Sequence, residues 1–199
     1  MLNDLLGLVL IGGRSTRMGK DKASIEYHGL PQWQYCIKLL QPFCKSVYVS
    51  CLESQRINLG IDVAIVDEVM DQGPAGGLWT AFKRFPEKAW FILACDYPLV
   101  MTEHLVPLIS ARDITIDAIS YKNPEDGLPE PLLSIWEPKL CDWFINQKPL
   151  ASPRKALIAN HCKLIEVVDR QILMNVNTEF LGVKSMKWPK PTGEKFPIA

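Results

Sequence analysis

The sequence lacks three features that would narrow its function at once: an excess of one charge, a long apolar run and a paired cysteine motif. Its 22 Lys and Arg residues balance 22 Asp and Glu residues, so no global basic field favours nucleic acid or a membrane as partner. The apolar run 5–11 is far too short to cross a bilayer, and no basic leader precedes it. We therefore expect a cytoplasmic protein without a signal peptide.

Cysteine and histidine are present without the spacing of a metal site. The six cysteines form no CxxC pair, and the three histidines are far apart in the sequence. The irregular cysteine spacing and the expected cytoplasmic location argue against disulfides. Cys36, Cys51 and Cys95 lie in apolar stretches and are predicted to be buried as small hydrophobic residues.

Short apolar segments alternate with longer mixed ones, which predicts an α/β fold with a mainly parallel sheet covered by helices. The expected strands are residues 5–11, 46–51, 63–66, 89–95, 114–120 and 131–136. The expected helices are residues 31–43, 76–85, 102–111, 137–147 and 152–160. We expect a single domain over residues 1–186, followed by an extended tail, 187–199, that is rich in Pro and Lys.

In such sheets, ligands bind beyond the carboxyl ends of the strands. That rule selects three places in this chain: the loop after residue 11, Asp67 after the strand 63–66, and Asp96 after the strand 89–95. We expect them to meet at one edge of the sheet.

The segment GGRSTRMGKDK (12–22) has the glycines and basic residues of a phosphate-binding loop, but it matches neither common pattern. Five residues separate Gly13 from Gly19, and Asp21 stands where a Walker A loop has the hydroxyl that binds Mg²⁺. The alternative is a charged surface turn. Because Gly12 and Gly13 follow a buried strand directly, the backbone there can approach a ligand closely, and we favour the phosphate site.

The segment LVLIGGRSTRMGKDKA (8–23) closely resembles the signature of MobA-type molybdenum cofactor guanylyltransferases. Further matches follow in the family's order at VDE (66–68), GPAGGL (73–78), ACDYP (94–98), LPEPLLSIW (128–136) and NVNT (175–178). The resemblance implies a Rossmann-like three-layer α/β/α nucleotidyltransferase fold. The chain departs from the family at Ile11, where Ala is common, and at Ala75-Gly76, where Leu-Ala is common.

The resemblance also implies roles for individual residues. Arg17 and Lys22 would clamp the triphosphate and the leaving pyrophosphate, and Asp96 would hold Mg²⁺; these three are the expected catalytic residues. For Asp96, the alternative is an acid that caps the following helix. The expected nucleotide-binding residues are Leu10, Ile11, Gly12, Gly13, Arg17, Lys22, Ser50, Asp67, Gly73, Gly77 and Asp96.

Some of these assignments compete with ordinary structural roles. Asp67 is nearly as well explained as a plain turn acid, and the loop 71–77 as a helix entry. On the acceptor side, Asn175 and Asn177 would face the same way in an extended segment, although two Asx turns explain them equally well. Glu130 either lines the acceptor side or is solvated.

The function expected from the resemblance is transfer of GMP from GTP to the terminal phosphate of molybdopterin, with release of pyrophosphate and with Mg²⁺ as cofactor. Transient contact with molybdenum-cofactor biosynthesis proteins or acceptor molybdoenzymes would accompany it. The alternatives are a cytidylyltransferase for the same pterin, another small-molecule-phosphate nucleotidyltransferase, and a non-catalytic nucleotide-binding regulator or chaperone of a molybdoenzyme.

Overall fold

The computed structural model describes residues 4–12, 22–69 and 71–173. Four of the expected site residues, Gly13, Arg17, Asn175 and Asn177, lie outside these ranges, as does the expected tail 187–199. The expected domain boundary at residue 186 lies outside them too and stays a prediction.

A seven-stranded sheet forms the centre of the molecule, in the order β3-β2-β1-β4-β6-β5-β7. Its strands are β1 (Leu5–Leu10), β2 (Ser46–Cys51), β3 (Ala64–Val66), β4 (Ala89–Ala94), β5 (Ala118–Lys122), β6 (Pro129–Trp136) and β7 (Cys162–Glu166). The first four strands run parallel, β6 is antiparallel to both of its neighbours, and β7 is parallel to β5.

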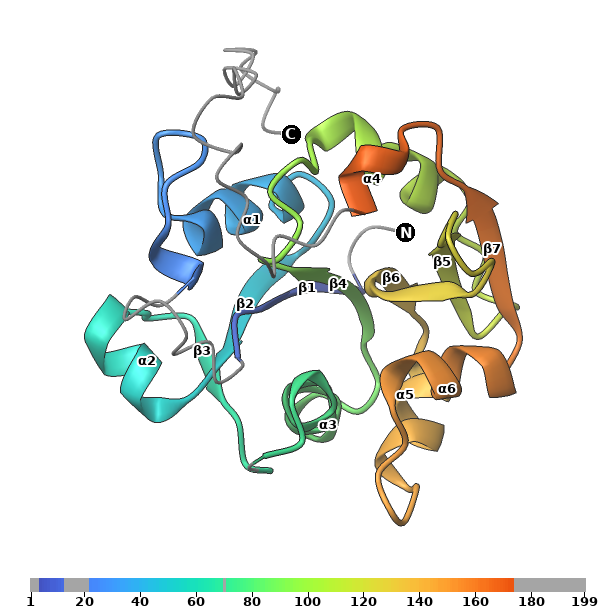
Figure 1. Ribbon diagram of the computed structural model, residues 1–199. Coiled ribbons are helices and arrows are strands. Elements are labelled where there is room, and N and C mark those ends of the chain that lie inside the picture. Colours follow the sequence, from blue (N-terminus) through green and yellow to red (C-terminus); the bar gives the residue numbers. More distant parts are fainter. Residues whose placement is uncertain (1–3, 13–21, 70, 174–199) are drawn as a thin grey trace.

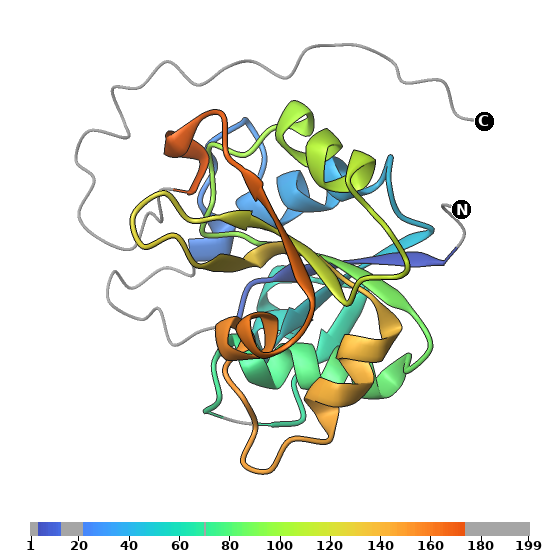
Figure 2. The ribbon, with the colours of Figure 1, turned by 90° about the vertical axis from the view of Figure 1, so that its right-hand side faces the viewer.

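Helices cover both faces of this sheet and give the expected three layers (Figures 1 and 2). They are α1 (Gln32–Leu40), α2 (Glu53–Leu59), α3 (Pro74–Arg84), α4 (Thr102–Ser110), α5 (Pro138–Ile145) and α6 (Pro153–Ala159). Figure 2 shows α1 and α4 on one face, with α3, α5 and α6 on the other. None of the described helices is long and apolar enough to cross a membrane.

The central strands form because their residues are apolar on both faces. All six residues of β1 and all six of β4 are buried, as expected for strands between two helical layers. Between the sheet and helices α3 and α5, Phe82 packs at 5.4 Å from Trp136 and at 5.8 Å from Phe144, measured between ring centroids. Trp90, also fully buried, extends this cluster on β4. The tryptophans of β4 and β6 are therefore core residues.

Three elements differ from the sequence prediction. The strand expected at 114–120 begins only at Ala118, because the Asp113 carboxylate accepts a hydrogen bond from the Thr115 amide at 2.9 Å and closes a turn. Helix α2 and strand β7 were not predicted. Five of the seven residues of α2 are polar or charged, and β7 is an exposed edge strand, so neither carries a clear apolar period.

Candidate active site

The carboxyl ends of the parallel strands lie level with one another. Leu10 at the end of β1 is paired with Ser50 on one side and with Ala94 on the other. The backbone continues this row for one further residue, since the Ile11 amide donates to the Ser50 carbonyl and the Cys95 amide to the Leu10 carbonyl. The same edge of the sheet therefore carries Asp67, Asp96 and the start of the loop that begins at Gly12, as the sequence predicted.

Four of the predicted nucleotide-binding residues come together at this edge. The Ser50 hydroxyl donates a 2.7 Å hydrogen bond to Oδ1 of Asp67. A Cβ atom at Gly12 would lie 3.1 Å from Oδ2 of Asp67, and one at Gly77 would overlap Oγ of Ser50. Glycine at both positions thus lets the end of β1 and helix α3 approach the Ser50–Asp67 pair closely. As a result, backbone without side chains lies against the Asp67 carboxylate on both of these sides.

The environment of Asp67 changes its acidity. Burial raises the pKa of this carboxyl group to about 6, and the hydrogen bond from Ser50 opposes part of that rise. A plain turn acid in solvent would not show such a shift, so the structure disfavours that alternative. A carboxylate with a raised pKa in a recess is typical of a binding site.

The loop before α3 brings a helix N-terminus to the same edge. Gly73 is the N-cap residue of α3, with a φ of 53° that favours glycine, and Pro74 occupies the first helical position. A Cβ at Gly73 would meet no atom of the described residues within 4 Å, so space is open there in the described part of the chain. The backbone N–H groups at such a helix start can bind an anion or the polar edge of a ligand.

Asp96 lies two residues beyond the end of β4 and is partly exposed. It does not cap the next helix, because the N-cap residue of α4 is Met101 and His104 accepts the hydrogen bond from the Met101 amide. The capping alternative for Asp96 is therefore wrong. Lys22 begins a short 3₁₀ turn, Lys22–Ser24, that leads into α1. The catalytic roles of Asp96 and Lys22 stay predictions.

The carboxylates at this edge suit a magnesium ion in number and kind. No three His, Cys, Asp or Glu side chains cluster as metal ligands within the described part of the chain. Mg²⁺ does not need such a cage, because it is commonly held by one or two carboxylates together with substrate phosphates and water. Asp96, just beyond the end of β4 at this edge, is the carboxylate predicted for this role, and the role stays a prediction.

Glu130 lies near the start of β6 at the same edge of the sheet, but it is not solvated. Only 5% of Glu130 is exposed. Its Oε2 lies 3.4 Å from Nη2 of Arg154 and accepts a hydrogen bond from Nδ2 of Asn123 at 3.4 Å. Burial raises the pKa of Tyr97, and the neighbouring Glu130 carboxylate raises it further. The solvated alternative for Glu130 is therefore wrong, and Glu130 belongs to a buried polar cluster next to the Asp96 loop.

Sequence reasoning missed two members of this cluster. Arg154 reaches from α6 to Glu130 and also pairs with Asp126 at 2.8 Å. Tyr97 follows Asp96 and is 3% exposed. Neither stood out, because Arg154 is one basic residue in a mixed helix and Tyr97 is one aromatic residue beside many. The neighbouring family match ACDYP (94–98) was the available signal for Tyr97.

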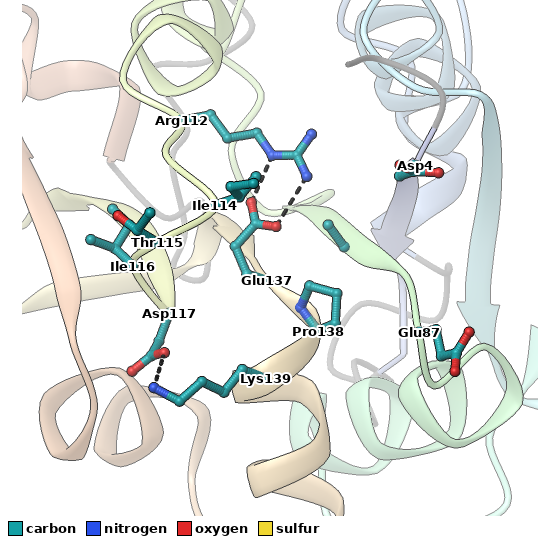
Figure 3. Close-up of a pocket in the computed structure, with 11 residues that line it drawn as sticks. Asp4, Glu87, Arg112, Ile114, Thr115, Ile116, Asp117, Glu137, Pro138 and Lys139 are labelled. Atoms are coloured by element: carbon teal, nitrogen blue, oxygen red, sulfur yellow. Dashed lines mark hydrogen bonds and ion pairs between the residues drawn. The ribbon is translucent and has the colours of Figure 1, made fainter.

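A separate cavity of about 400 Å³ opens at the opposite edge of the sheet (Figure 3). Figure 3 shows Arg112 facing Glu137 and Lys139 facing Asp117. Two hydrogen bonds of 2.6 and 3.0 Å join Arg112 to Glu137, and Nζ of Lys139 lies 2.8 Å from Asp117. None of the predicted site residues that the structure describes lines this cavity. It is thus distinct from the candidate active site.

The comparison with protein families matches residues 7–162 to the model described as the MobA-like NTP transferase domain. This segment contains the glycine loop, Ser50, Asp67, Gly77, Asp96 and Glu130. The chain belongs to the MobA-like NTP transferase family. The family expected from the sequence motifs is confirmed.

Individual relatives agree with this membership. The chain is 34% identical over 178 residues to the molybdenum cofactor biosynthesis bifunctional protein of Synechocystis sp., covering 87% of this chain but only 51% of that protein. It is 28% identical to the molybdenum cofactor guanylyltransferase of Ectopseudomonas mendocina, covering 90% of each. The chain thus spans about half the length of the Synechocystis relative and nearly all of the other.

A solved structure has the same fold. The molybdopterin-guanine dinucleotide biosynthesis protein A of Archaeoglobus fulgidus superposes with a TM-score of 0.69 at 21% identity, over 90% of this chain and 95% of that one. The Rossmann-like fold expected from the family resemblance is therefore confirmed.

Proposed function

We propose that this protein transfers GMP from GTP to the terminal phosphate of molybdopterin cofactor and releases pyrophosphate, in the biosynthesis of molybdopterin guanine dinucleotide. The family membership and the names of the Synechocystis and Ectopseudomonas relatives support the reaction class and the acceptor. The geometry around Asp67 supports the choice of base.

The observation that carries the proposal is the Asp67 carboxylate in its glycine-walled recess. Guanine presents two adjacent donors, N1–H and the N2 amino group, and a carboxylate can accept from both. Cytosine presents a single amino donor beside acceptor atoms, which a carboxylate repels. With Ser50 fixing Oδ1 of Asp67, the carboxylate is oriented before the base arrives. This arrangement favours a guanylyltransferase over the cytidylyltransferase alternative.

The reaction needs positioning and charge neutralisation rather than a strong base. The second pKa of a phosphate monoester is about 6, so the acceptor phosphate is already anionic near neutral pH. Its oxygen forms a bond to the α-phosphorus of GTP while the bond from that phosphorus to the bridging oxygen breaks, and pyrophosphate leaves with the electron pair. Lys22 and Arg17 would neutralise the charge that accumulates on the leaving pyrophosphate.

Asp96 would hold Mg²⁺ at the end of β4. When bound, this ion supplies positive charge that stabilises the negative charge on the α-phosphate oxygens, and it orients the leaving group. The N-terminus of α3 at Gly73 would lie beside the nucleotide and donate backbone N–H groups to it.

The acceptor would enter on the side of β6. There the guanidinium of Arg154 is held between Asp126 and Glu130 and is partly exposed, which suits contact with an anionic group of the pterin. Asn175 and Asn177 are part of the same proposal as polar contacts to the pterin. A cytoplasmic location also belongs to it, in line with the irregular spacing of the cysteines in the sequence.

The test is a binding and turnover comparison. We expect calorimetry to show GTP binding at least about tenfold more tightly than CTP, the margin expected when a buried polar group is left unpaired by the wrong base. We also expect GTP, Mg²⁺ and molybdopterin together to yield pyrophosphate. Tighter binding of CTP would favour the cytidylyltransferase alternative, and GTP binding without pyrophosphate release would favour the non-catalytic regulator.

A further inference from the structure

Two stacked aromatic rings connect the segment after Lys22 to the loop after Asp96. His28 and Tyr35 lie face to face, with ring centroids 3.8 Å apart and planes inclined by 16°. Both residues are 8% exposed. His28 lies in the turn before α1 and Tyr35 lies within that helix, so the stack belongs entirely to the part of the chain that follows Lys22.

Each ring contacts a backbone carbonyl of the opposite loop. Nε2 of His28 lies 2.7 Å from the carbonyl oxygen of Pro98, and the Tyr35 hydroxyl donates to the carbonyl of Val100 at 3.3 Å. Because a carbonyl can only accept, Nε2 of His28 carries the hydrogen. Pro98 and Val100 are two and four residues beyond Asp96, and both are buried. The loop that carries Asp96 is thus held by two side chains from one stack.

The segment that bears the stack is itself closed onto Lys22. The Ile25 amide donates to the Lys22 carbonyl at 3.1 Å, and the Gln32 amide donates to the Ile25 carbonyl at 2.9 Å. Glu26 and Pro31 form an antiparallel bridge across the turn. Movement of the stack would therefore carry Lys22 with it.

We propose that His28, supported by Tyr35, is a positioning residue that sets the distance between the Asp96 loop and the Lys22 segment. This inference rests on the proposed function, because it assigns the purpose of the contact to the metal and triphosphate site. Phosphoryl-group transfer depends on in-line geometry, and a misplacement of about 1 Å can cost about 100-fold in rate. A hydrogen bond from a stacked, buried ring fixes the loop more narrowly than solvent-exposed contacts would.

Three variants separate the contacts. His28→Phe keeps a ring for stacking and removes the donor to Pro98. His28→Gln keeps an Nε2 donor at similar reach, and Tyr35→Phe removes only the hydroxyl that reaches Val100. His161→Phe is the matched control, because His161 is exposed and its neighbour Cys162 begins β7 at the opposite edge of the sheet.

Two affinities are measured. Electron paramagnetic resonance monitors Mn²⁺ binding to the full chain in complex with α,β-methylene GTP. Calorimetry measures binding of the same analogue in the absence of metal. We expect His28→Phe to weaken Mn²⁺ binding by about fivefold or more, as one lost hydrogen bond would, while metal-free analogue affinity changes by less than about twofold. His28→Gln restores most of the Mn²⁺ affinity, and Tyr35→Phe gives a smaller loss in the same direction.

Unchanged Mn²⁺ affinity in His28→Phe would overturn the inference. So would an equal loss in His28→Gln that is accompanied by loss of cooperative unfolding, because the ring would then only stabilise the fold. If His28→Phe does not fold, Tyr35→Phe decides by the same two measurements. Wild-type protein that binds Mn²⁺ with the analogue, yet releases no pyrophosphate from GTP when molybdopterin is present, contradicts the proposed function and leaves the positioning inference to these variants.

Discussion

At the scale of single residues, Asp67 carries both a functional and an energetic consequence. Burial raises its pKa to about 6, which places its titration within the range of ordinary assay buffers. The same carboxylate is oriented by Ser50 and faced by Gly12. The protonation state of Asp67 therefore decides whether its carboxylate can accept two hydrogen bonds from a nucleobase.

We predict that GTP affinity falls as pH decreases through about 6, because protonation of Asp67 removes the anionic acceptor for guanine. Calorimetry between pH 5 and pH 8 measures this, with correction for titration of the GTP phosphate by parallel titrations of Asp67→Asn. The variant should bind GTP weakly and without that inflection. A wild-type profile that parallels the variant would show that Asp67 does not contact the base.

The same substitution should stabilise the protein at high pH. The folded pKa of Asp67 lies above the unfolded value near 3.8, so the ionised carboxylate costs stability at neutral pH, and this cost vanishes as pH falls below both values. With allowance for partial solvent access, we expect Asp67→Asn to raise the free energy of unfolding by ~1–2 kcal/mol at pH 8. Thermal unfolding at pH 8 and pH 4 measures the difference, and an equal effect at both values would contradict this cause.

At the scale of elements, the packing of α3 against β2 forms one wall of the site. Helix α3 can lie this close only because Gly76 and Gly77 have no side chains: a Cβ at Gly76 would overlap the Val69 carbonyl, and one at Gly77 would overlap the Ser50 hydroxyl. The helix start and the Ser50–Asp67 pair are therefore coupled in position. A shift of α3 would move both.

We predict that Gly77→Ala weakens GTP binding by about tenfold or more, because the new methyl group pushes α3 away from Ser50. Ala is a better helix former than Gly by about 1 kcal/mol, so helix propensity alone would stabilise α3 rather than disturb it. Calorimetry with GTP measures the loss. The double variant Ser50→Ala/Gly77→Ala removes the overlapped hydroxyl and should recover part of the affinity; wild-type affinity in Gly77→Ala would mean that the contact does not shape the site.

At the scale of the whole molecule, the two edges of the sheet have different duties. The carboxyl edge carries Gly12, Asp67 and Asp96, whereas the opposite edge holds the Arg112–Glu137 pair beside the cavity of Figure 3. Both side chains of that pair are nearly buried, at 13% and 5% exposure. The pair joins the end of α4 to the start of α5 and so links both helical layers at the edge away from the site.

We predict that Arg112→Met destabilises the protein by ~3–5 kcal/mol, because it leaves the buried Glu137 carboxylate without its cation. Transfer activity at a temperature where the variant is folded should stay near that of the wild type. Urea unfolding and a low-temperature assay measure the two effects. Arg56→Ala breaks an exposed ion pair with Glu53 and should leave the unfolding midpoint nearly unchanged. A folded Arg112→Met protein without activity would contradict the separation of the two edges.

The sequence by itself determined the elements whose apolar pattern is strong and the family to which they belong. β1 and β4 were predictable because nearly every residue is apolar, and the strand-end rule then placed Asp67 and Asp96 at one edge. Weakly patterned elements such as α2 and β7 escaped, because their order depends on neighbours distant in the sequence. The same reason hid Arg154, which gains its meaning only where α6 packs on β6.

Only the tertiary structure decided the burial, the hydrogen-bond partners and the orientation of the polar side chains. The sequence alone does not show that Glu130 is buried or that Ser50 orients Asp67. Nor does it show that His28 and Tyr35 contact the loop after Asp96. Burial and hydrogen bonding depend on contacts between segments many residues apart, and these contacts set pKa values and side-chain orientation. Composition and local pattern therefore specify where the strands end, while packing specifies what the side chains at those ends can do.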